Sequence, residues 1–216
     1  MARDYPLGFD AYDLAIRVVH AHDVSSDEAI AGIMMLLLCW NAQYYYRQGR
    51  MDYQLVDHHI GLLREALSRH RHLLCSLKLR RLEEVDFDQT LCPSSITVRE
   101  ALCRLYRALS RFLGATGASK ALHLLLPDLV VMWDSGIRGQ YRLPATHVGF
   151  LRFHEFMQSE LRQALRTYMA DHGGTEREAI RAILRERYGE HVERPITKVL
   201  DEYNWVLAHL GRLGAP

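Results

Sequence analysis

The sequence predicts an all-α fold on three observations. Capping signals followed by apolar residues at three- and four-residue intervals recur along the chain, beginning at Ser25, Thr97 and Thr175. No segment alternates apolar and polar residues for long enough to predict a strand. With 49% hydrophobic residues, a chain of 216 residues can bury a substantial core. We therefore expect one helical domain over residues 1–216.

The first half of the chain contains three expected helices, at residues 10–21, 27–47 and 52–82, with a break in the third as an alternative. The box Ser25-Ser-Asp-Glu28 marks the start of the second helix, and its apolar run Ala29–Trp40 predicts a core helix. This run of 12 residues is shorter than the ~20 that cross a bilayer. We therefore expect no membrane partner.

The second half contains six expected helices with local start or stop signals. Thr97-Val-Arg-Glu100 and Thr175-Glu-Arg-Glu178 are capping boxes, Pro127 ends a short helix, and Pro195 occupies a first helical turn. The loop 83–96 and the turn 172–174 are the expected hinges of a bilobal helical bundle. The six helices are expected at residues 97–113, 119–126, 135–142, 147–170, 175–188 and 195–211.

Charge and cysteine content narrow the function classes. A formal net charge of +1 neither requires nor excludes nucleic-acid binding, and the arginines form no run. Since no Cys-x-x-Cys occurs, we expect neither an iron–sulfur cluster nor a zinc site, and no cofactor. The first residues contain no apolar signal core and the cysteines fit a reducing compartment, so we expect a cytoplasmic protein.

The twelve histidines do not change the expectation that the protein has no metal site. His20 and His22, like His58 and His59, point to different helix faces, so neither pair forms an i, i+4 chelate. His123 falls three residues after Lys120 and so on nearly the same face, where it could tune a site or cover the surface.

The stretch Phe112–Arg138 is the most informative part of the chain. Gly114 and Gly117 follow an expected helix, and a C-cap there requires the positive φ that glycine adopts freely. We therefore expect the chain to reverse between helices 97–113 and 119–126. The second helix opens at Ser119 with free N–H groups that can hold a phosphate. Asp134 is a good N-cap for the helix that follows.

These residues resemble the helix-hairpin-helix DNA glycosylase superfamily, over about residues 105–142. In that family a hairpin of the form L-P-G-[VI]-G-x-[KQ]-x-A precedes a segment like V-D-T-H-V-x-R. Here the hairpin Gly-Ala-Thr-Gly is one residue longer, and Lys120 falls three residues after the second glycine instead of two. Gly136 replaces a usual histidine, and Arg138 comes one residue early.

The resemblance implies a helix-hairpin-helix near residues 97–126 and specific roles for its residues. Asp134 would be the catalytic aspartate, and Lys120 the lysine that distinguishes glycosylase/lyases from simple hydrolases. Gly114 and Gly117 would grip DNA phosphates through their amides, with Ser119 and Arg138 as further nucleic-acid contacts. Such a lysine attacks the sugar C1′ carbon as a neutral amine, while the carboxylate stabilises the cationic sugar.

Lysine is rare in this chain, which favours a specific role for Lys120. Only Lys78, Lys120 and Lys198 are lysines, against 24 arginines. Together with this lysine, the resemblance implies a base-excision glycosylase, with lyase activity as an option, that acts on an extruded damaged base of double-stranded DNA. Two alternatives stay open: a non-catalytic nucleic-acid-binding module of the same fold, and a helical, dimeric or monomeric protein unrelated to DNA. In the second, Lys120 is a solvated residue and Asp134 only a cap.

The segment after the apolar run is a second candidate. Asn41, Gln43, Tyr44 and Tyr45 come together at the end of the expected helix 27–47, close to two arginines. Aromatic faces combined with arginine can stack on bases, so these residues are base-pocket candidates. The alternative is that the tyrosines only pack in the core or an interface.

Overall fold

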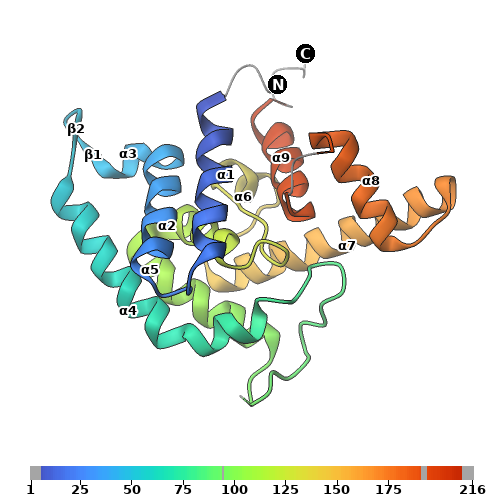
Figure 1. Cartoon of the computed structure of the whole chain (residues 1–216), viewed down its shortest axis with the longest axis horizontal. Coiled ribbons are helices and arrows are strands. Elements are labelled where there is room, and N and C mark those ends of the chain that lie inside the picture. The colour runs from blue at the N-terminus through green and yellow to red at the C-terminus, as the bar shows by residue number, and fades with distance from the viewer. Residues whose placement is uncertain (1–5, 94, 191–193, 211–216) are drawn as a thin grey trace.

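The computed structural model describes residues 6–93, 95–190 and 194–210 and confirms the all-α class (Figure 1). Within these ranges the chain forms nine helices and one short hairpin. Their bounds are α1 Pro6–Ala21, α2 Asp27–Trp40, α3 Ala42–Tyr45, β1 Tyr46–Arg47, β2 Arg50–Met51, α4 Tyr53–Leu77, α5 Val98–Leu125, α6 Ser135–Gln140, α7 His147–His172, α8 Glu176–Tyr188 and α9 Ile196–His209.

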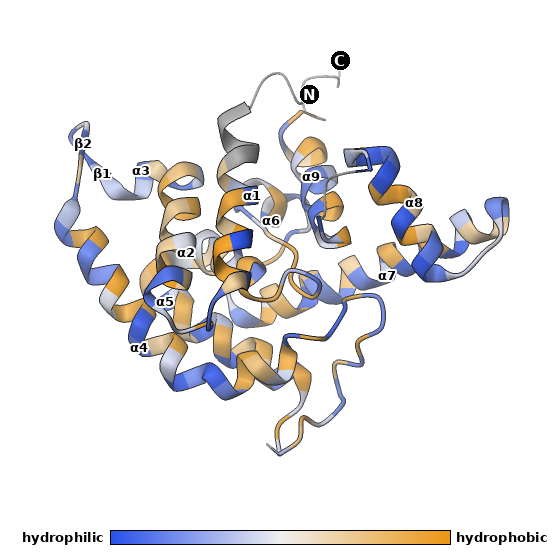
Figure 2. Cartoon of the chain, viewed as in Figure 1, coloured by the Kyte–Doolittle hydropathy of each residue, from blue (hydrophilic) through white to orange (hydrophobic). Residues whose placement is uncertain are grey.

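The long helix α5 is the centre of the packing, since it contacts α1, α2, α4 and α7. The α8 helix lies against α7 and α9, and α9 also packs on α6. Buried apolar side chains form one cluster that extends from Tyr12 of α1 to Ala208 of α9. The mostly hydrophilic α8 contributes only Ala179 as a fully buried residue (Figure 2). Burial of the apolar faces of the other helices therefore holds this arrangement together.

Local capping signals fixed several helix starts. Thr97 with Glu100 and Thr175 with Glu178 form the two predicted capping boxes. The box predicted from Ser25 is wrong, because Ser26 caps α2 and accepts a hydrogen bond from the Ala29 amide. Ser25 instead donates to Asp23, both from its amide and from its hydroxyl.

The helix predicted over residues 27–47 is shorter than expected. It ends at Trp40, where Asn41 leaves the helical region with φ −138°. After the single turn of α3, β1 and β2 pair through the turn Gln48-Gly49, both residues of which have positive φ. Two adjacent positive φ values match the type I′ turn that suits two-residue hairpins. The expectation of no strand is therefore wrong at this point.

The break predicted between two helices at Gly114–Gly117 is present, but it is confined to Gly114. The α5 helix runs through this region with one non-helical residue, Gly114, at φ 69° and ψ 175°. Gly117 lies in the helix interior, where a Cβ would come 3.0 Å from Leu113 Cβ and 3.7 Å from Asn41 Nδ2. The kink at Gly114 therefore divides α5 into residues 98–113 and 115–125.

Residues 126–133, which we call the connector, cross the core between α5 and α6 without regular structure. Leu129 to Trp133 are at most 2% exposed. Backbone groups buried in this way need partners, and side chains supply them. The His123 imidazole donates from Nδ1 to the Val130 carbonyl (2.6 Å), and the Val131 amide donates to His154 Nε2 (3.0 Å). The connector thus carries the chain through the core to Asp134.

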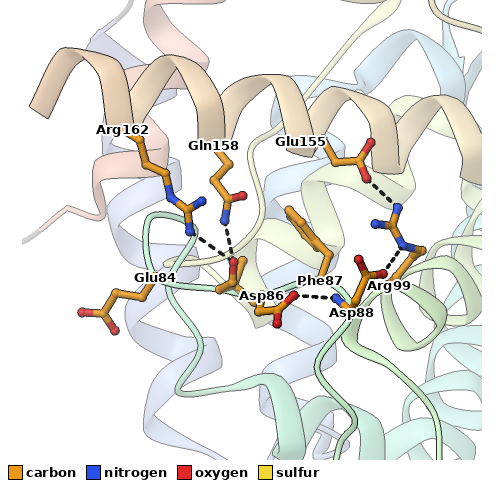
Figure 3. Close-up of a pocket in the computed structure, with 9 residues that line it drawn as sticks. Glu84, Asp86, Phe87, Asp88, Arg99, Glu155, Gln158 and Arg162 are labelled. Carbon is orange, nitrogen blue, oxygen red and sulfur yellow. Dashed lines mark hydrogen bonds and ion pairs between the residues drawn. The ribbon is translucent and has the colours of Figure 1, made fainter. Parts of the chain in front are cut away.

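The loop between α4 and α5 is attached to α7 (Figure 3). Gln158 donates to the carbonyls of Leu82 and Val85, and Arg162 donates to those of Glu83 and Val85. A second turn, at Gly173 and Gly174 with φ of 72° and 88°, joins α7 to α8. These are the two expected hinges, and the division into lobes stays a prediction.

Candidate active site

The Lys120 amine lies at the C-terminal end of α2. Its Nζ donates to the Trp40 carbonyl (2.6 Å) and lies 5.8 Å from the centroid of the Trp40 ring. That carbonyl belongs to the last turn of α2, whose carbonyls lack partners within the helix. The lysine therefore satisfies a helix end while remaining half-buried.

Burial lowers the pKa of Lys120 from 10.5 to about 8. The carboxylates of Asp201 and Asp134 act in the opposite direction and raise it, while the Lys198 ammonium lowers it further. At pH 7 about one such amine in ten is neutral, roughly 300 times the fraction of an ordinary lysine. Lys120 can therefore serve as a nucleophile near neutral pH.

Asp134 caps α6, as the sequence predicts. Its Oδ1 accepts a hydrogen bond from the Ile137 amide (2.9 Å), and its Oδ2 lies 3.4 Å from His209 Nε2. The side chain is 26% exposed. Gly136 leaves room for this histidine, because a Cβ there would come 2.8 Å from the His209 ring. The carboxylate is thus held through Oδ1 by the backbone of α6, and its Oδ2 faces the His209 imidazole.

One residue pair fixes Lys120 relative to Asp134. The hydroxyl of Ser119 lies 2.9 Å from the Trp133 carbonyl and accepts from the Trp133 amide at 3.2 Å. Ser119 precedes Lys120 and Trp133 precedes Asp134, so these bonds align the second half of α5 with the start of α6. In this arrangement the negative charge of Asp134 raises the pKa of Lys120.

A second lysine, Lys198, reaches the same place from α9. Its Nζ lies 5.0 Å from the Trp40 ring centroid and 5.4 Å from that of Tyr12, and it pairs with Asp201 Oδ2 at 2.6 Å. Tyr12 stacks on Trp40, with centroids 5.8 Å apart and planes 11° apart. Sequence reasoning missed Lys198, although its being one of three lysines was a usable signal.

His123 connects this site to the connector. The Tyr12 hydroxyl donates to His123 Nε2 (2.7 Å), while Nδ1 is used by Val130. Full burial lowers the pKa of His123 to about 3, so the ring is neutral and has one donor and one acceptor nitrogen. Of the two predicted locations for His123, the surface is excluded.

The residues expected to contact DNA phosphates are mostly buried or half-buried. Gly114 has the predicted positive φ, but Gly117 is buried inside the helix. Ser119 is fully buried and committed to Trp133, so it is no contact for nucleic acid. The half-buried Arg138 lies over the Trp133 ring, with its Cζ 5.5 Å from the centroid.

The base-pocket candidates do not form one group. Tyr45 is buried, and its hydroxyl bonds to His59 Nδ1 (3.1 Å). Tyr44 donates to the Phe112 carbonyl near the kink, and Gln43 is exposed. Only Asn41, which follows Trp40 and approaches Gly117, lies close to the Lys120 turn. We therefore keep Asn41 as the candidate nearest the amine.

A pocket of about 330 Å³ lies elsewhere, between the loop 84–88 and α7 (Figure 3). Its charged side chains largely serve each other: Arg99 contacts Asp88 at 3.0 Å and Glu155 at 2.5 Å. Across the described ranges, no three His, Cys, Asp or Glu side chains are grouped so that they could hold a metal ion. The pocket therefore offers little chemistry beyond attaching the loop.

Comparison with known proteins leaves the site to be interpreted from its own geometry. Neither protein-family models, nor curated proteins, nor solved structures give a match to this chain. In the part of the chain that is described, no helix is long and apolar enough to cross a membrane.

Proposed function

We propose that this protein excises damaged bases from double-stranded DNA and acts as a lyase, with Lys120 as the nucleophile and Asp134 as the assisting carboxylate. The observation that carries the proposal is the pair itself: a half-buried amine with a lowered pKa, held near a partly exposed carboxylate by the Ser119–Trp133 contact. The sequence resemblance over about residues 105–142 supports the choice of substrate.

The chemistry follows from these two groups. The neutral Lys120 amine attacks C1′ as the bond to the base breaks and the base leaves with the bonding electrons and a proton. The amine gives up one proton to the departing base and the other to the ring oxygen O4′ as the C1′–O4′ bond breaks, and an imine joins Nζ to C1′ in the opened sugar. Asp134 stabilises the positive charge that develops on the sugar. A carboxylate stabilises such a charge more strongly where water is partly excluded from the site. The base must first leave the stack.

The test is covalent trapping with borohydride, which reduces the imine to a stable amine. Wild-type protein incubated with duplexes that contain an abasic site or an oxidised base is expected to form a protein–DNA adduct. Lys120→Ala is expected to abolish the adduct. The matched control is Lys78→Ala, because Lys78 is exposed at the end of α4 and distant in sequence from the site.

Asp134→Asn separates binding from catalysis. It keeps the shape of the side chain and removes the charge, so base release is expected to slow while DNA binding is retained. Salt-dependent binding without trapping over a broad lesion panel would favour the non-catalytic binding module. No binding at all would favour a helical protein unrelated to DNA.

A further inference from the structure

Two of the three lysines of the chain converge on one tryptophan. Lys120 from α5 and Lys198 from α9 both lie within 6 Å of the Trp40 ring centroid, at 5.8 and 5.0 Å. The Lys198 ammonium lowers the pKa of Lys120 by electrostatic repulsion, whereas the Asp201 carboxylate raises it by attraction. The arrangement therefore depends on how the acidic groups are shared.

The nearby carboxylates belong to Lys198. Asp201 Oδ2 contacts Lys198 Nζ at 2.6 Å, and Glu202 Oε1 lies 3.6 Å from the same nitrogen. Among the residues that the structure describes, no carboxylate lies within ion-pair distance of Lys120, whose Nζ is bonded to the Trp40 carbonyl. Lys198 is 4% exposed and Asp201 9% exposed, so their pairing is shielded from water.

We propose that Lys198 is a positioning residue for Lys120, because by holding the Asp201 carboxylate it prevents Asp201 from clamping Lys120 as an ammonium ion. This inference rests on the proposed function for its purpose, since a free amine matters only if Lys120 reacts. The physical claim is independent of DNA. It concerns which of the two lysines forms an ion pair with the buried Asp201 carboxylate.

All charged groups that act on the Lys120 amine enter this balance. Asp134 approaches from the cap of α6, and Asp201 and Lys198 come from α9. Tyr12 and His123, which also surround Lys198, are uncharged, because burial raises the pKa of the phenol and lowers that of the imidazole. Substitutions that remove a charge from the Lys198–Asp201 pair are therefore expected to change the pKa of Lys120.

The experiment measures the reactivity of Lys120 with formaldehyde and cyanoborohydride, without DNA, from pH 6 to 10. The neutral amine adds to the aldehyde, water leaves, and hydride reduces the imine to a methylamine that peptide mass spectrometry quantifies. The exposed Lys78 in the same sample is the standard for reagent consumption. Lys120 of the wild type is expected to reach half its maximal rate near pH 8.

Two substitutions are expected to shift this profile in opposite directions. Lys198→Met releases Asp201 towards Lys120 and removes a repelling charge, so the profile moves up by about one pH unit, roughly a tenfold loss of rate at pH 7. Asp201→Asn removes an attracting charge, so the profile moves down. Lys198→Arg keeps the ion pair and is expected to leave the profile in place.

Shifts of equal sign, or no shift in either variant, would overturn the inference. Simple destabilisation cannot imitate the expected result, because local unfolding exposes Lys120 in both variants and shifts both profiles in the same direction. If Lys198→Met does not fold, Asp201→Asn still decides the sign. Opposite shifts together with no DNA trapping would retain this role of Lys198 and refute base excision.

Discussion

The two halves of α5, which meet at Gly114, contribute differently to the protein. Residues 98–113 place apolar side chains such as Leu102, Leu105 and Leu109 in the core. Residues 115–125 also bury leucines, but they add Ser119, Lys120 and His123, three polar groups that each bond to a distant backbone atom. Apolar packing tolerates changes of shape, whereas these bonds require fixed partners and protonation states.

The largest effect should come from acid, which acts on the second half of α5 through His123 and on the connector through His154. Burial lowers the pKa of His123 to about 3 and that of His154, which bonds to the connector, to about 4. Both are neutral in the folded protein but become protonated in the unfolded chain below about pH 6.5. The unfolded state then binds more protons, so stability falls as the pH drops from 6.5 towards 4.

Between pH 7.5 and 4.5 we expect the two histidines to lower the free energy of unfolding by on the order of 3–5 kcal/mol. Urea unfolding at both pH values measures the loss. His154→Gln cannot be protonated and is expected to remove about half of this dependence. An unchanged pH dependence in that variant would show that His154 is not held neutral.

Paired serine substitutions compare the two halves directly. Ser119→Ala leaves the buried Trp133 amide and carbonyl without their partner, so we expect a loss of about 2–4 kcal/mol. Ser110→Ala is the matched control in the first half, since its half-buried side chain has no hydrogen bond within the described part of the chain. It is expected to change stability by no more than about 0.5 kcal/mol. Equal effects would remove the distinction between the halves.

Ser119→Ala should also weaken the site itself. Without the Ser119–Trp133 contact, Lys120 and Asp134 are no longer aligned, and borohydride trapping is expected to fall more than DNA binding. Trapping at the wild-type level in a folded Ser119→Ala protein would show that the contact is dispensable.

The smallest effect concerns the kink between the halves. Gly114→Ala forces a Cβ onto φ 69° and ψ 175°, which is nearly exclusive to glycine, at a cost of about 1–3 kcal/mol. Neither this position nor Gly139 in α6 has an atom within 4 Å of an added Cβ. Gly139→Ala, in ordinary helical backbone, should therefore stabilise by up to about 1 kcal/mol. Thermal melts of both variants give the comparison, and equal shifts would contradict a strained kink.

Local signals explain which parts of the fold could be predicted. The boxes at Thr97 and Thr175 and the cap at Asp134 were correct, because a cap depends on residues three or four positions apart. The break at Asn41 was missed because no proline or glycine marks it and the apolar pattern continues into the tyrosines. The extent of the turn at Gly114 was overestimated, since Gly117 serves close helix packing instead.

The surroundings of the candidate site could be predicted only in part, for a different physical reason. Lys120 and Asp134 were singled out as candidates because they lie 14 positions apart in a stretch that resembles a known family. Lys198, Tyr12 and Trp40 join them only through tertiary contacts between α1, α2, α5 and α9, which no local pattern encodes. Likewise, the sequence could not show whether Ser119 is a buried residue bonded to the Trp133 backbone or an exposed residue at a helix start.

The most direct test of the account is the protonation of Lys120. With three lysines in the chain, selective ¹³C labelling at Cε gives three NMR resonances, and Lys120→Arg identifies the one of interest. We predict that this resonance titrates near pH 8, as burial beside Trp40 requires. Titration near the ordinary lysine value of about 10.4 would contradict the account, because Lys120 would then be a solvated cation with no capacity for nucleophilic chemistry at neutral pH.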